Sequence, residues 1–343
     1  MRKLKGLGLV FILVSACAGI VFAQDTHALF EQGRKQFDAK QYDAAINTFN
    51  QYLVKVPNDA GAYFNIGLCY YDLNRYEEAV AAYRKAIQIK PNYADAYIYL
   101  GNSLDYLKRY NEAIAAYMKA VEIDPSNASA YSEIGVAHAR QDNHTAAIEA
   151  YEKSISLDPK NAETYYKVAK QYNAVKRTDD AIKALREAVR LQPDHTKAWV
   201  DLGYRLNDIK SFQEAITAFR QAIRLEPSND DAFLGLGDSY YNDGNYSDSV
   251  QYYKKASEIA PSRITAKLYL GDAYLNSDQN QLALSTYQAA SAIDPKNAPA
   301  IYGIGLVYLK LKNVAMARAQ YNKLVPLDKA TADKLLGKMN SQP

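Results

Sequence analysis

The stretch ADAYIYLGNSLDYLKRYNEAIAAYMKAVEIDPSN, residues 94–127, decides the fold, because the rest of the chain repeats its pattern. Its proline is one of eight that stand 34 residues apart. These prolines are Pro57, Pro91, Pro125, Pro159, Pro193, Pro227, Pro261 and Pro295. A proline cannot continue a helix, so each of them ends one copy of the same supersecondary unit. The sequence therefore predicts a repeat protein.

Small and large residues also recur at fixed places inside each unit. The copy at 94–127 has Gly101, Ala113 and Tyr117, and most other copies have a small residue, an alanine and an aromatic ring at the same places. Nine copies begin at Thr26, Ala60, Ala94, Ala128, Ala162, Thr196, Asp230, Ile264 and Ala298. Because one helix pair cannot bury its apolar face alone, we expect the copies to stack on one another.

The pattern resembles the tetratricopeptide repeat. Repeat 3 carries its signature in Tyr97, Leu100, Gly101, Leu104, Ala113, Tyr117, Ala120 and Pro125. Over residues 24–331 the resemblance implies an all-α fold, a right-handed α-solenoid (superhelix) of antiparallel helix pairs. Repeat 5 departs from the pattern, with Ala169 in place of the glycine and Leu185 in place of the aromatic residue. After Lys329, which replaces the last proline, the apolar spacing predicts a capping helix and tail over residues 332–343.

The N-terminal segment has the composition of an export signal. Basic residues precede an apolar run from Leu7 to Ala23, which predicts a signal peptide over residues 1–23 with cleavage before Gln24. We therefore expect an exported protein of the bacterial periplasm or cell envelope. The alternative is a lipoprotein anchored at Cys17, because the preceding Val14, Ser15 and Ala16 resemble a lipobox. That anchor would be the chain's contact with a membrane.

Charge and cysteine content argue against a nucleic-acid-binding protein and against a reactive cysteine. The chain has 41 basic and 38 acidic residues, and three of the basic residues lie in the predicted signal. The remainder is formally neutral, so no basic excess favours nucleic acid, and none is expected as a partner. Cys69 is the one cysteine outside the signal, and its place among helix-packing residues predicts a small core residue rather than a reactive thiol.

No catalytic constellation stands out in the sequence. The histidines, among them His138 and His195, do not have metal-ligand spacing with cysteine or with one another. Glycines recur singly, at the helix-packing position, and do not form phosphate-binding loops. We therefore predict that the protein is not an enzyme and binds no cofactor or metal.

Tyrosine is unusually abundant, with 30 residues, and most of them fall at core positions of the repeat. The resemblance implies that repeat positions 2, 5, 6, 9, 12 and 13 of each first helix line a concave groove. Eight tyrosines that the core does not explain fall on this set, and tyrosine is enriched where proteins bind partners. The predicted partner-binding residues are Phe64, Asn65, Tyr71, Tyr99, Asn102, Tyr106, Tyr166, Tyr204, Asp208, Asp238, Tyr241 and Tyr269.

Acidic residues outnumber basic residues at these groove positions, which favours a protein or peptide partner that contains lysine or arginine. We therefore predict a protein-interaction scaffold in bacterial envelope assembly or secretion. Two alternatives remain open at this point. The protein could self-assemble into a homo-oligomer of structural function, or the aromatic groove could bind a glycan or another small ligand.

Overall fold

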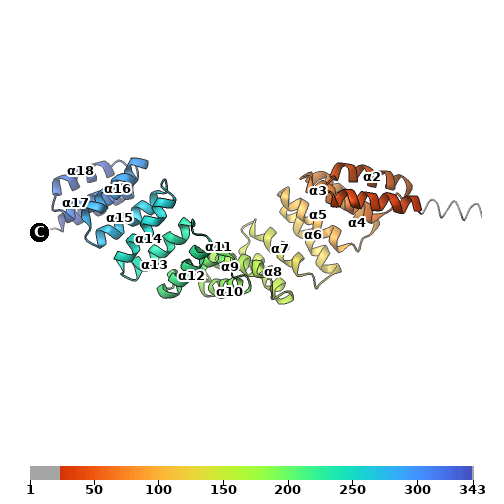
Figure 1. Ribbon diagram of the computed structural model, residues 1–343, viewed down its shortest axis with the longest axis horizontal. Helices are drawn as coiled ribbons and strands as arrows, with labels where there is room; N and C mark the ends of the chain where they lie inside the picture. Colours follow the sequence, from red (N-terminus) through yellow and green to blue (C-terminus); the bar gives the residue numbers. More distant parts are fainter. Residues whose placement is uncertain (1–23, 342–343) are drawn as a thin grey trace, which may run out of the picture. The chain divides into compact units, whose positions relative to one another are not determined.

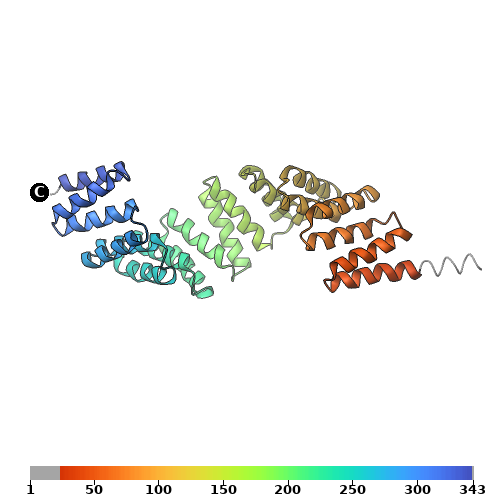
Figure 2. The ribbon, with the colours of Figure 1, turned by 90° about the horizontal axis from the view of Figure 1, so that it is seen from above.

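The computed structural model describes residues 24–341, which form helices joined by short turns, without a strand. The chain divides into two compact units between Val175 and Lys176, in the turn between the two helices of repeat 5. Consecutive helices pack in antiparallel pairs within each unit, which confirms the all-α solenoid (Figures 1 and 2). The predicted export signal and Cys17 lie outside the described residues.

The helix boundaries follow the repeat frame. The first unit begins with a helix over residues 24–38 and continues with α2 (Tyr42–Lys55), α3 (Ala60–Asp72), α4 (Tyr76–Ile89), α5 (Ala94–Tyr106), α6 (Tyr110–Ile123), α7 (Ala128–Ala139), α8 (His144–Leu157) and α9 (Ala162–Ala174). The second unit contains α10 (Thr178–Leu191), α11 (Thr196–Asp208), α12 (Phe212–Leu225), α13 (Asp230–Asn242), α14 (Tyr246–Ile259), α15 (Ile264–Asn276), α16 (Asn280–Ile293), α17 (Ala298–Lys310), α18 (Val314–Leu324) and α19 (Lys329–Asn340). None of the helices in residues 24–341 combines the length and the apolar character that a membrane span requires.

Three local devices set where the helices begin and end. The residue before the periodic proline leaves the helical conformation, as at Lys90 (φ −124°, ψ 88°) and Asp124 (φ −127°, ψ 88°), which stops the second helix. The first helix ends before a left-handed residue at repeat position 15: Lys40, Asn74, Lys108, Asp142, Lys176, Lys210, Gly244, Asp278 and Lys312. Position 34 often supplies a side chain that caps the next first helix, and His195 serves this purpose by accepting a hydrogen bond from the Ala198 amide. His195 therefore has a structural role.

The core is built from the ring and glycine that the sequence spacing singles out. The rings of Tyr83, Tyr117, Tyr151 and Tyr287 are buried, each against the glycine of its own repeat. A Cβ atom added at Gly101 would lie 2.4 Å from Cε1 of Tyr117, closer than real Cβ atoms approach a neighbour. The glycine is therefore required because the ring occupies the place of its side chain.

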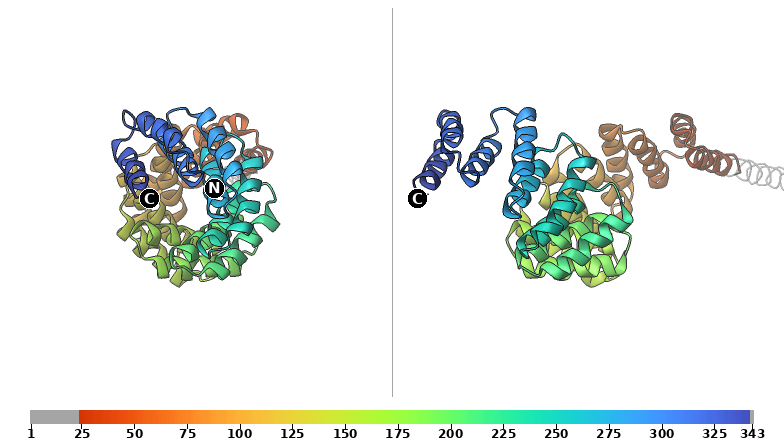
Figure 3. Two further views of the ribbon diagram at one scale, coloured as in Figure 1. Left: turned by 90° about the vertical axis from the view of Figure 1, so that its left-hand side faces the viewer. Right: turned by 60° about the vertical axis from the view of Figure 1, so that its left-hand side comes forward.

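Helix α19 lies where the sequence predicts a capping helix, and it begins three residues earlier, at Lys329. Its Ala332, Leu335 and Met339 are buried in a cluster with residues of α17 and α18. Leu335 lies against Gly305, the position that the repeat's own ring covers in other copies. These last helices, in dark blue, close the end of the second unit (Figure 3).

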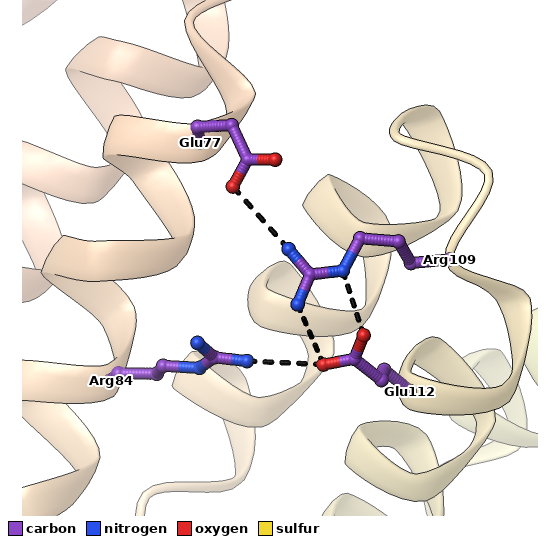
Figure 4. A network of polar contacts seen from close by, with 4 residues as sticks. All are labelled: Glu77, Arg84, Arg109 and Glu112. Carbon is purple, nitrogen blue, oxygen red and sulfur yellow. Dashed lines mark hydrogen bonds and ion pairs between the residues drawn. The ribbon is translucent and has the colours of Figure 1, made fainter.

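A network of ion pairs joins adjacent second helices in the first unit (Figure 4). Arg109 forms a two-pronged contact with Glu112, at 2.7 Å for both hydrogen bonds, and reaches Glu77 of α4 at 3.3 Å. Arg84 of α4 reaches Glu112 of α6 at 3.2 Å. Arg109 is half-buried and the other three side chains are exposed, so each pair contributes little alone, and the network mainly aligns repeats 2 and 3.

Candidate functional site

The first unit carries a cluster of aromatic side chains from the first helices α3 and α5 and from the start of α4. We call Phe64, Tyr71, Tyr76, Tyr99 and Tyr106 the tyrosine cluster; four of them are predicted groove residues. Tyr99 of α5 contacts Phe64 and Tyr71 of α3, with ring centroids 5.6 and 5.9 Å apart. Tyr71 also contacts Tyr106 at 5.7 Å, and Tyr106 stacks on Tyr76 at 4.6 Å with an interplanar angle of 2°. The cluster thus joins repeats 2 and 3 through one continuous set of ring contacts.

The tyrosine cluster is partly open to solvent. Tyr106 is 55% exposed, whereas Phe64, Tyr71 and Tyr99 are half-buried. Burial raises the pKa of the Tyr71 hydroxyl above its ordinary value, with a further contribution from Tyr106, so this hydroxyl remains a hydrogen-bond donor at neutral pH. The surface therefore offers apolar ring faces together with polar hydroxyl groups.

The second unit has a pocket of about 290 Å³ on its first-helix face. Its lining comes from three consecutive helices, α13, α14 and α15. The lining residues are Asp238, Tyr241, Asn242, Tyr253, Tyr269 and Asp272. Three predicted groove residues, Asp238, Tyr241 and Tyr269, are therefore brought together around one cavity. We call it the two-aspartate pocket.

Both carboxylates of the two-aspartate pocket are held by buried tyrosines. The Tyr253 hydroxyl donates a hydrogen bond to Asp238 Oδ1 at 2.7 Å, and the Tyr287 hydroxyl donates one to Asp272 Oδ1 at 2.5 Å. Burial nevertheless raises the pKa of both aspartates, although these hydrogen bonds lower it, and Arg263 also lowers that of Asp238. The fold therefore disfavours the charged form of each aspartate.

Replacing Asp272 with asparagine is expected to stabilise the protein at neutral pH by about 1 kcal/mol. The amide can still accept the Tyr287 hydrogen bond, while the charge that burial disfavours is removed. Because the folded-state pKa of Asp272 is raised, the native protein gains stability as the pH falls below that pKa, and the advantage of Asp272→Asn should shrink there. Thermal unfolding midpoints at neutral and acidic pH measure this. The exposed Asp333→Asn in α19 is the control, and a lower midpoint for Asp272→Asn at pH 7 would contradict the expectation.

The other predicted groove residues belong to neither the tyrosine cluster nor the lining of the two-aspartate pocket, and each has a partner of its own. Asn65 donates to the carbonyl of Gly61, and Asn102 accepts from the Tyr117 hydroxyl at 2.8 Å. The remaining contacts are Tyr166 under Lys170, the Tyr204 hydroxyl to the Asp231 carbonyl, and Asp208 paired with Arg205.

Four residues at the two places were not among the predicted site residues: Tyr76, Asn242, Tyr253 and Asp272. Tyr253 occupies the buried ring position, and only its hydroxyl reaches Asp238. A signal for this contact exists in the sequence. Each repeat with asparagine or aspartate at position 9, namely Asn102, Asp238 or Asp272, has tyrosine at the ring position. The converse does not hold, because Tyr83, Tyr151 and Tyr321 occur with Leu68, Val136 and Leu306 at position 9.

Residues 24–341 contain no cluster of histidine, cysteine and carboxylate side chains that could hold a metal ion. Cys69 is fully buried, and burial raises the pKa of its thiol to about 12. The thiol is therefore protonated at neutral pH, as expected of a core residue rather than a nucleophile.

Comparison with known protein families agrees with this repeat architecture. The model described as the cilia and flagella-associated protein 70 C-terminal domain, a tetratricopeptide repeat domain, matches residues 8–234. The chain belongs to this family of tetratricopeptide repeat domains. Three further family models, each of tetratricopeptide repeats, match residues 206–264, 271–312 and 298–331 of the chain.

Solved structures of tetratricopeptide repeat proteins are also similar. YrrB, described as having an unusual peptide-binding site, is 27% identical over 55% of this chain and 96% of its own, with a TM-score of 0.51. A tetratricopeptide repeat protein from Parabacteroides merdae is 17% identical over 72% of this chain and 99% of its own, with a TM-score of 0.53. MamA is 26% identical over 50% of this chain and 94% of its own, with a TM-score of 0.47. No curated protein sequence gives a significant match.

Proposed function

We propose that this tetratricopeptide repeat protein is a non-enzymatic scaffold that binds a segment of a partner protein along its first helices. The tyrosine cluster is the observation that carries the proposal. Its rings present a large, semi-rigid contact area, and its hydroxyls can bond directionally, a combination common at binding surfaces. Tyr106 leaves more than half of its surface exposed at the edge of the cluster, where a partner would cover it.

Carboxylates on the first helices of each unit favour a partner segment that contains basic residues. Beyond the two-aspartate pocket, Glu133 lies half-buried on α7, and burial raises its pKa, partly offset by Lys167. A basic side chain of the partner would compensate such charges. The similarity to YrrB, a protein with a peptide-binding site that is 27% identical over the matched region, supports a peptide segment as the kind of partner.

The setting that we propose is the bacterial periplasm or cell envelope, in envelope assembly or secretion. This part of the proposal rests on the composition of residues 1–23, which reads as an export signal, with a lipid anchor at Cys17 as the alternative. Fractionation of cells that produce the tagged protein, with and without Cys17→Ala, distinguishes a released protein from an anchored one.

Replacing Tyr106 with alanine is expected to weaken capture of the partner by about tenfold, a typical loss for a tyrosine at a binding hot spot. The purified full chain is used as bait in envelope extract, and bound proteins are quantified by mass spectrometry. Met118→Ala is the matched control, because Met118 belongs to the same repeat, is 52% exposed and lies on the second helix, α6.

A protein retained by the native chain and by Met118→Ala, but lost with Tyr106→Ala, is the expected result. Loss with Met118→Ala alone would place binding on the second helices instead. Recovery of nothing but the protein itself would reject the partner-binding proposal in favour of self-assembly, and recovery of a glycan would favour a carbohydrate-binding groove.

A further inference from the structure

The two-aspartate pocket brings together two carboxylates that no ion pair within the described residues compensates. Within the described residues, neither Asp238 nor Asp272 takes part in an ion pair. The nearby Arg263 is held by two other carboxylates, Asp230 at 2.6 Å and Asp231 at 2.7 Å. Two half-buried carboxylates therefore line one cavity, each bonded only through Oδ1 to a tyrosine hydroxyl.

Repeat 3 shows whether the hydrogen bond to the core tyrosine requires a carboxylate. There the position equivalent to Asp238 and Asp272 is Asn102, and its Oδ1 accepts from Tyr117 at 2.8 Å. A neutral amide thus makes the same hydrogen bond as the two carboxylates. The contact with the core tyrosine explains a hydrogen-bond acceptor at this position, but it does not explain a negative charge.

The rest of the lining suits an organic cation. Tyr253 lies between two other rings, 6.4 Å from Tyr241 and 5.7 Å from Tyr269. The faces of aromatic rings attract cations, most strongly where water is excluded. Asn276 donates a hydrogen bond to the Tyr241 hydroxyl at 2.6 Å, which fixes one wall before any ligand enters.

We propose that the two-aspartate pocket binds the ammonium group of a lysine side chain. One oxygen of each aspartate is bonded to tyrosine, which leaves the second oxygen of each to accept from the ligand. An ammonium has three diverging donors and can bond two separate carboxylates, whereas a guanidinium prefers both oxygens of one carboxylate. The proposal rests on the partner-binding function above and assigns one side chain of the partner to one cavity.

A short peptide tests the pocket without knowledge of the partner. The probe is an acetylated and amidated pentapeptide with a central lysine between leucines, and it is titrated into the full chain by calorimetry. The matched probes contain acetyl-lysine or arginine at the centre. We expect the lysine peptide to bind at least tenfold more tightly than the acetyl-lysine peptide and about threefold more tightly than the arginine peptide.

The variant Asp238→Asn with Asp272→Asn is expected to lose at least tenfold in affinity for the lysine peptide. The matched control is Asp243→Asn with Asp333→Asn, which removes the same charge from two exposed positions outside the pocket. Unfolding midpoints verify that both double variants fold, as the Asn102 contact indicates.

Equal affinity for the lysine and acetyl-lysine peptides would overturn the proposal that the pocket binds an ammonium group. An equal loss of affinity in both double variants would overturn it as well. Equal binding of the arginine peptide would overturn the assignment to an ammonium. These outcomes are distinct from failure of the scaffold function. Tyr106→Ala should leave the affinity for the lysine peptide unchanged. Conversely, if the pocket proposal is wrong, the double aspartate variant will not change this affinity, while partner capture can still depend on Tyr106.

Discussion

Replacing Gly101 with alanine is expected to lower the free energy of unfolding by about 2 to 3 kcal/mol. The added Cβ would stand 2.4 Å from Cε1 and 2.7 Å from Cδ1 of Tyr117, so the ring would have to move. Tyr117 is 1% exposed, and Asn102 holds its hydroxyl, so little space is available for that movement. Alanine is the better helix former, and it returns only about 1 kcal/mol of the loss. Chemical denaturation measures the effect.

The same change at Gly337 is the control, because no atom lies within 4 Å of a Cβ added there. Gly337→Ala should be neutral or stabilising. Tyr117→Leu should partly rescue Gly101→Ala, because it removes the ring atoms that clash, and repeat 5 carries alanine and leucine at these two positions of its sequence, Ala169 and Leu185. In a double-mutant cycle, purely additive effects would contradict this explanation.

The fold could be predicted almost completely because each repeat restates the same local rules. The proline at the end of α6, the glycine of α5 and the ring of α6 all follow from a single repeat, and eight further copies test them. The left-handed residue at position 15 was not predicted. Lysine, asparagine and aspartate occupy it in eight copies, so the glycine that usually signals such a conformation stands only at Gly244.

The candidate site could be predicted only in part, because repeat position says which helix face a residue occupies but not which side chains meet. Tyr241 and Tyr269 were assigned to the groove by position, whereas their gathering with Asp238 around one cavity depends on how α13 and α15 pack on α14. Tyr76 shows the same limit. Its position in the repeat is commonly a packing position, and its stacking on Tyr106 of the next repeat depends on the spacing between two helix pairs.

Replacing Arg140 with alanine is expected to destabilise the protein by about 2 kcal/mol. Arg140 follows α7 and pairs with Asp105 of α5. Asp105 is only 7% exposed. Breaking a fully buried pair costs about 3 to 5 kcal/mol, and the loss here is smaller because the Arg140 side chain is 45% exposed. Lys119→Ala, which breaks an exposed pair with Glu122 in the same unit, is the control and should cost less than about 0.5 kcal/mol.

The loss should depend on pH in a defined direction. Burial raises the pKa of Asp105 while Arg140 lowers it, so the variant should have a still higher folded-state pKa. A raised carboxyl pKa means that stability is lost as the pH rises through it and is recovered below it. The penalty of Arg140→Ala should therefore be largest at neutral pH, should diminish in acid, and should be reduced at neutral pH by a second change, Asp105→Asn. A penalty that is constant with pH would show that Arg140 acts through packing alone.

Asp105 and the two aspartates of the pocket differ in whether the chain supplies an ion-pair partner for the carboxylate. Both units carry buried or half-buried carboxylates on their first helices, and in both burial raises the carboxyl pKa. In the first unit the next repeat supplies a cation, Arg140, which neutralises Asp105 from within the chain. In the second unit Asp238 and Asp272 receive tyrosine hydroxyls, and within the described residues neither forms an ion pair, because Arg263 pairs with Asp230 and Asp231 instead. We expect Arg140→Ala to destabilise the protein and Asp272→Asn to stabilise it. That result would mean that the charge of Asp105 is balanced within the fold, whereas the pocket aspartates need a cation from a partner.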